Sequence, residues 1–102
     1  MILLSMRFRA HPSKRHEVLS AIDTVIERMQ LSSGCTESRL FADTEDPDAF
    51  ALRSEFESID DADVFFTSED FRVLRGLRML LRDEPFVVVD EVRGRTTRLV
   101  HD

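Results

Sequence analysis

The chain has 102 residues, of which 33% are charged, and carries a formal net charge of -6. This length predicts one domain with a single modest core, here residues 1–102, with a polar tail from about residue 94 that is flexible or packs on a partner subunit. The acidic balance disfavours nucleic acid or an anionic membrane as a partner. No apolar run approaches the roughly 20 residues of a membrane span. The one cysteine, Cys35, cannot form an internal disulfide, which is typical of a cytoplasmic protein.

The first third of the chain predicts a strand followed by a helix. Residues 2–10 alternate between apolar and polar side chains, which is the period of a half-buried strand. Residues 12–31 carry apolar side chains at helical spacing and polar side chains on the opposite face. Gly34 follows as a residue suited to the positive φ angle that often ends a helix.

The middle of the chain predicts a hairpin. Residues 35–44 indicate a strand with weak alternation, and residues 49–57 a strand with clear alternation. Asp46-Pro47 lies between them, and these residue types favour a tight turn. Two adjacent strands joined by such a turn are expected to pair as an antiparallel hairpin.

The last part of the chain predicts two helical segments and a final strand. Ser58 is the expected cap of a short helical link, and Thr67 or Ser68 is the expected cap of the next helix. Residues 86–93 then predict the last strand. The unbroken Phe-Val-Val-Val run that opens this strand is typical of burial on both faces.

The resulting order, β-α-β-β-α-β, predicts a ferredoxin-like α+β protomer with a four-stranded antiparallel sheet and its helices on one face. The other face of the sheet is expected to be too apolar for solvent and too charged for a plain core. A second copy of the chain lying across this face as a C2 homodimer, with ion pairs between the subunits, would satisfy both properties. The side chains expected there are Leu3, Ala51, Val87, Val89, Arg7, Arg53, Glu55 and Glu91.

Four short motifs on this frame carry a family resemblance that covers about residues 3–92. The motifs are Gly34-Cys35, Asp46-Pro47, Phe50-x-Leu52 and Ser68-x-x-Phe71. Together they resemble the antibiotic-biosynthesis-monooxygenase-type domains of the dimeric α+β barrel superfamily. The resemblance implies a homodimer whose sheets face each other, with a small pocket between each sheet and its helices. Some members oxidise phenols or quinols with molecular oxygen and no cofactor, whereas others degrade haem, isomerise lactones or have no known activity.

The chain departs from this family at four pocket positions. Members often carry a Tyr four residues after the glycine, where this chain has Ser38, and a Glu two residues before a Trp, where it has Ser54 and Phe56. They often carry a His before the last helix, where this chain has Phe65. A pocket without a base or a hydrogen-bond donor deprotonates a phenol poorly. Haem ranks low, because the axial His and the Trp of the haem-degrading branch have no visible equivalents.

The sequence offers few candidate site residues. His16, Ser38 and Ser54 are weak candidates for catalytic polar groups, although a histidine near a helix start is more often a surface residue. A lining of phenylalanine would suit a flat, apolar aromatic ligand, and a plain core would use the same residues. These pocket candidates are Phe8, Phe41, Phe56 and Phe65. No pair of His, Cys and carboxylate residues has metal-ligand spacing, so a metal site is not expected. The resemblance implies that no other cofactor is needed.

A stripe of arginines on the last helix has two interpretations. It could bind phosphate groups or an acidic partner, but such a stripe is more often a solvated helix face. Its members are Arg72, Arg75, Arg78 and Arg82.

Three functions remain open. The first is a cofactor-independent monooxygenase acting on a quinol- or anthrone-like aromatic, which itself supplies the electrons to oxygen. The second is a non-catalytic dimeric domain that binds an apolar small molecule. The third is an isomerase or cyclase, which would need an acid–base pair that the sequence does not offer. Oxygen uptake, ligand-induced stabilisation without turnover, and substrate consumption without oxygen uptake distinguish the three.

Overall fold

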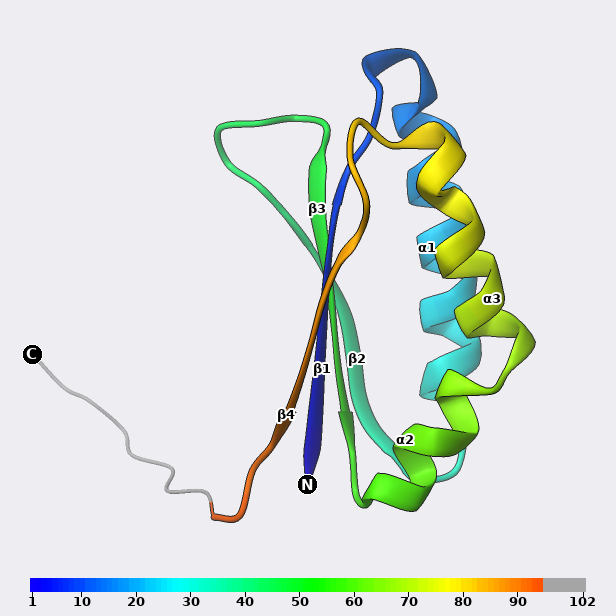
Figure 1. The fold of residues 1–102 in the computed structure, drawn as a ribbon, viewed down its shortest axis with the longest axis vertical. Coiled ribbons are helices and arrows are strands. Elements are labelled where there is room, and N and C mark those ends of the chain that lie inside the picture. The colour runs from blue at the N-terminus through cyan, green and yellow to red at the C-terminus, as the bar shows by residue number, and fades with distance from the viewer. Residues whose placement is uncertain (95–102) are drawn as a thin grey trace, which may run out of the picture.

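The computed structural model describes residues 1–94, and this part of the chain folds as one sheet covered by helices on one side (Figure 1). The predicted tail beyond residue 94, with His101, lies outside the described residues. Two short 3-10 helices, η1 and η2, flank the longer helices. The elements are β1 (Ile2–Arg9), η1 (Pro12–Lys14), α1 (Arg15–Gln30), β2 (Cys35–Ala42), β3 (Ala49–Phe56), α2 (Ile59–Phe66), α3 (Glu69–Gly76), η2 (Leu77–Leu80) and β4 (Phe86–Glu91).

The sheet has the strand order β2-β3-β1-β4, and every neighbouring pair is antiparallel. This is the predicted ferredoxin-like arrangement, and Figure 1 shows all the helices on the same side of the sheet. β2 and β4 are the two edge strands, and β1 lies between β3 and β4. Among residues 1–94, no helix has the length and apolar character needed to cross a membrane.

The predicted helix boundaries follow from local chemistry. Gly34 has a φ angle of 85°, and a Cβ atom added there would clash with the side chain of Asp61. The Oγ of Ser58 accepts a hydrogen bond from the backbone N–H of Asp61, and the Oγ of Ser68 accepts one from the N–H of Phe71. Both serines therefore satisfy N–H groups that the first turn of a helix leaves unpaired.

The core lies between the sheet and the helices. Leu4 and Met6 of β1 and Leu52 of β3 have no exposed surface, and they belong to one buried cluster with apolar side chains of α1, α2 and α3. The alternation predicted for these two strands is confirmed, because their helix-facing side chains are buried while their neighbours are mostly exposed or half-buried. The buried members of α1 are Val18, Ile22, Val25, Ile26 and Met29.

The prediction that the last strand is buried on both faces is wrong. Val87 and Val89 pair with Met6 and Leu4 on the helix side of the sheet, yet they are 40% and 44% exposed. Phe86, on the other side, is 58% exposed. β4 is an edge strand, and α3 packs on α1 rather than over β4. The apolar run therefore has little cover within residues 1–94.

The register of β4 also corrects the predicted composition of the outer face of the sheet, the face without helices. Val87, Val89 and Glu91 lie on the helix side, because they pair with the inward-facing residues of β1. Phe86 and Val88 take their place on the outer face. A shift of one residue reverses every side chain of a strand. Leu3, Ala51, Arg7, Arg53 and Glu55 are on the outer face as predicted.

Candidate functional site

The two predicted catalytic serines lie in a closed part of the core. Ser38 of β2 and Ser54 of β3 are paired across the strands, and their Oγ atoms are 2.9 Å apart. Each Oγ also lies within 3.8 Å of the sulfur of Met29, and neither side chain has more than 1% of its surface exposed. Among the described residues, no buried polar side-chain atom lacks a partner. The serine pair is therefore satisfied internally and leaves no free polar group to a substrate.

The third predicted catalytic residue, His16, lies apart from this pair. It is exposed in the first turn of α1 and does not line either hollow described below. Cys35 is half-buried, and burial raises the pKa of its thiol, while its S–H donates to the carbonyl oxygen of Glu37 at 3.5 Å. Such a thiol is mostly protonated at neutral pH and acts as filler. Within residues 1–94, no group of three His, Cys, Asp or Glu side chains could hold a metal ion.

Of the four predicted pocket phenylalanines, two stack on each other. The rings of Phe56 and Phe65 have centroids 5.7 Å apart, and the ring of Phe65 meets Phe71 edge-on at 5.5 Å. Phe8 is also buried on the helix side, but it pairs with Phe50 toward the other end of the strands. These contacts place three of the candidates in the packed core.

Grouping Phe41 with these three residues is incorrect. Phe41 is 48% exposed and pairs with Ala51 on the outer face of the sheet, because side chains alternate along β2 and Ser38 and Leu40 face the helices. There it borders a shallow hollow of about 190 Å³. The residues that line this hollow are Leu3, Glu37, Arg39, Phe41, Arg53 and Glu55.

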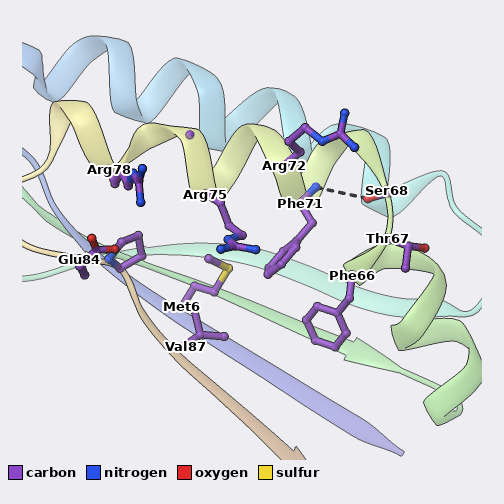
Figure 2. Close-up of a pocket in the computed structure, with 12 residues that line it drawn as sticks. Met6, Phe66, Thr67, Ser68, Phe71, Arg72, Arg75, Arg78, Glu84 and Val87 are labelled. Carbon is purple, nitrogen blue, oxygen red and sulfur yellow. Dashed lines mark hydrogen bonds between the residues drawn. The ribbon is translucent and has the colours of Figure 1, made fainter.

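A larger, open groove of about 740 Å³ lies between α3 and the edge of the sheet that β4 forms (Figure 2). We call it the α3–β4 groove. Met6 and Val87 contribute its sheet side, and Phe66 and Phe71 form an aromatic wall with ring centroids 5.1 Å apart. The Ser68 cap fixes the first turn of α3, and from this turn Phe71 points toward the sheet. The half-exposed Val87 of β4 thus borders a hollow of a size typical for small-molecule sites.

The other side of the groove carries three arginines of the predicted stripe. Figure 2 shows Arg75 extending from α3 toward the sheet between Met6 and Phe71, whereas Arg72 points away. Arg72 forms an ion pair with Glu69 at 3.2 Å. Within residues 1–94, Arg75 makes no ion pair and no side-chain hydrogen bond, so its guanidinium is available to a ligand.

The fourth arginine of the stripe belongs to a different contact. Arg82 pairs with Asp46 of the β2–β3 turn at 2.7 Å and also donates to the carbonyl oxygen of Ala10. The pKa of Asp46 is lowered, first by the hydrogen bond from the backbone N–H of Asp48 and then by Arg82. The stripe is therefore divided: Arg82 holds the turn, and Arg75 and Arg78 face the groove.

Sequence reasoning did not place the residues of this groove together. Met6 and Glu84 both line the groove, and neither was among the candidate site residues. The signal that could have found the site was the combination of an arginine stripe with an apolar last strand. That signal needed the correct register of β4 before it pointed to one cavity.

Comparison with known proteins assigns the family. A family model described as antibiotic biosynthesis monooxygenase matches residues 1–76, about three quarters of the sequence. The chain therefore belongs to the antibiotic biosynthesis monooxygenase family. The match ends at the last residue of α3, so Arg78, Glu84 and Val87 lie beyond it. No curated protein matches the chain.

Solved structures with the same fold are similar over nearly the whole chain. Rv0793 from Mycobacterium tuberculosis superimposes with a TM-score of 0.84 at 20% identity, over 94% of this chain and 98% of that one. A protein from Deinococcus radiodurans, named for the same family, gives a TM-score of 0.88 at 12% identity, over 99% and 100%. A further antibiotic biosynthesis monooxygenase gives 0.81 at 21% identity, over 92% and 100%. At these identities the likeness establishes the fold.

Proposed function

We propose that this protein is a cofactor-independent monooxygenase that oxidises an electron-rich aromatic, such as a quinol or an anthrone, bound in the α3–β4 groove. The observation that carries the proposal is Arg75, whose guanidinium has no ion-pair partner within residues 1–94. It extends toward the sheet between the fully buried Met6 and the ring of Phe71, and the half-exposed Val87 belongs to the same lining. Val87 and the aromatic wall suit a flat ring system.

The chemical role of Arg75 follows from what such a substrate needs. A phenol or anthrone gives electrons to oxygen more readily once it is deprotonated, and a nearby positive charge favours the deprotonated form. The proton leaves to water, which reaches the open groove. For an anthrone, the CH₂ group and O₂ become a C=O group and H₂O: the carbon gives up four electrons, one oxygen atom enters the carbonyl and the other leaves as water. The substrate is thus its own reductant.

The test is oxygen uptake by the purified, metal-stripped protein with neutral hydroquinones and anthrones, corrected for autoxidation. We expect protein-dependent uptake, and a loss of kcat/KM of roughly tenfold or more in R75Q because the charge that stabilises the anion is gone. The activity of R75Q should also recover partly at higher pH, where the substrate ionises unaided. R15Q is the matched control: Arg15 is exposed at the start of α1, away from the groove, and this variant loses the same charge. Equal uptake in R75Q and R15Q would contradict the proposal.

A second candidate function is non-catalytic binding of an apolar aromatic in the same groove. The closed Ser38–Ser54 pair favours it, because it occupies positions where family members often carry a Tyr and a Glu. Ligands that raise the melting temperature without any oxygen uptake would support this alternative.

We further propose that the protein acts as a homodimer through the outer face of its sheet. Phe41 and Phe86 are both about half exposed there, and the guanidinium of Arg7 lies 5.5 Å from the ring centre of Phe86. A second copy would cover these rings and leave the α3–β4 groove, on the opposite side, open to substrate. Sedimentation equilibrium tests this, and a monomer at micromolar concentration would contradict it.

A further inference from the structure

The charge of the α3–β4 groove is opposite to that of the protein. The chain carries a net charge of -6, but three arginines and one carboxylate line the groove. Glu69 neutralises Arg72 through their ion pair, which leaves Arg75 and Arg78 against Glu84. The groove therefore keeps an excess of one positive charge on an acidic protein.

Arg78 differs from Arg72 and Arg82 of the same stripe, each of which forms an ion pair with a carboxylate of the chain. Six of the eleven arginines in residues 1–94 form such a pair, and Arg7, Arg15, Arg53, Arg75 and Arg78 form none. Arg78 is exposed, and Glu84 lines the same groove and lies near it in Figure 2. The guanidinium of Arg78 is therefore accessible to an anionic ligand in the groove.

Arg78 also lies apart from the aromatic wall formed by Phe66 and Phe71. Arg75 and Arg78 are three residues apart and line the same groove, with Arg78 further toward the Glu84 end. A ring resting on Val87 and Phe71 beside Arg75 would extend one edge toward Arg78. One arginine is thus available for the reacting oxygen and a second for another group of the ligand.

We propose that Arg78 forms an anion-binding subsite, and that the groove takes aromatic ligands that carry a carboxylate on the edge distant from the reacting position. A carboxylate is favoured over a phosphate for two reasons. A guanidinium fork matches the two oxygens of a carboxylate, and the excess of one charge matches a monoanion better than a dianion. This inference rests on the proposed location of the substrate in the groove, but it requires no turnover.

The experiment measures equilibrium binding of three ligands that cannot be oxidised further: anthraquinone-2-carboxylate, its carboxamide and the 2-phosphonate. Isothermal titration at low salt should show the carboxylate binding roughly tenfold more tightly than the carboxamide, because the guanidinium then meets an anionic acceptor in place of a neutral one. R78Q should abolish this preference and leave the affinity for the carboxamide unchanged. R15Q, which loses the same charge away from the groove, should retain the preference.

A further variant separates a binding role of Arg78 from a structural one. Removing the negative charge in E84Q should strengthen binding of the carboxylate and not of the carboxamide, an effect that a purely structural change would not produce. Three results would overturn the inference. The first is equal affinity for the carboxylate and the carboxamide, the second is no binding of either, and the third is a preference for the carboxylate that survives in R78Q. Tighter binding of the phosphonate than of the carboxylate would overturn the assignment of the ligand class. Oxygen uptake with neutral hydroquinones tests the proposed function separately, so failure of one can be told from failure of the other.

Discussion

The helix side of the sheet has two regions that differ at a single strand boundary. Met6 of β1 lies between Leu52 of β3, which has no exposed surface, and Val87 of β4, which is 40% exposed. The region over β1, β2 and β3 is closed by α1, and its polar groups, Ser38 and Ser54, bond to each other. The region beside β4 is open, and its charged groups include two arginines without a partner in the described chain.

This difference shows where chemistry can occur. Ser38 and Ser54, which the sequence offered as catalytic candidates, fall in the closed region and are packed core. The open region has the properties of a binding site: a hollow, apolar and aromatic surface, and arginines that have no ion-pair partner within residues 1–94. The contacts of this chain therefore direct the proposals to the open region.

The largest effect is expected on the free energy of unfolding, when the two neighbours of Met6, Leu52 and Val87, are each truncated. L52A removes a fully buried side chain and should lower the free energy of unfolding by about 2–4 kcal/mol. V87A removes a side chain from the same face of the same sheet, but it should cost less than about 1 kcal/mol because much of that side chain is already in water. Urea denaturation of both variants measures the difference.

An equal loss in the two variants would break the comparison. It would mean that Val87 is as well packed in solution as Leu52, and that the α3–β4 groove is closed in the protein. The proposals for Arg75 and Arg78 would then lose their binding surface. A small loss in V87A, accompanied by weaker binding of anthraquinone-2-carboxamide, would instead confirm that Val87 contacts ligand rather than core.

Periodicity and capping signals were sufficient to predict the elements and their order. The caps Ser58 and Ser68 and the positive φ angle of Gly34 were correct because each depends on chemistry within a few residues. The face and burial of β4 were predicted wrongly, because Phe-Val-Val-Val contains no alternation from which to read a register. Whether a strand lies at an edge also depends on pairings far along the chain.

The groove residues could not be predicted from the sequence for a related reason, because their arrangement depends on tertiary contacts. The arginine stripe was visible, but its division was not: Arg82 is paired by Asp46, a residue 36 positions earlier, whereas Arg78 has no such partner. Which member of a helical stripe faces a cavity is set by tertiary contacts. The same holds for Ser38 and Ser54, whose pairing across two strands converts two apparent active-site groups into one structural contact.

The smaller effect concerns this serine pair. S54A leaves the buried Oγ of Ser38 without its oxygen partner and should cost about 1–2 kcal/mol of unfolding free energy. The S38A/S54A double variant removes both groups and should cost less than the sum of the two single variants, with a coupling of at least about 0.5 kcal/mol. Urea denaturation of the four proteins closes this cycle.

The same four proteins decide between the two regions as sites of chemistry. If oxygen is consumed in the α3–β4 groove, kcat/KM of S38A/S54A should stay within about twofold of the wild type, because neither serine lines that groove. If the losses of unfolding free energy in the two single variants simply add, the two serines do not stabilise the fold through their mutual hydrogen bond. A large loss of oxygen uptake in a folded S38A/S54A protein would place the active site at the Ser38–Ser54 pair instead. The two roles of the serines thus predict different results. If the serines stabilise the core, S38A/S54A changes the free energy of unfolding; if they contact the substrate, it changes kcat/KM.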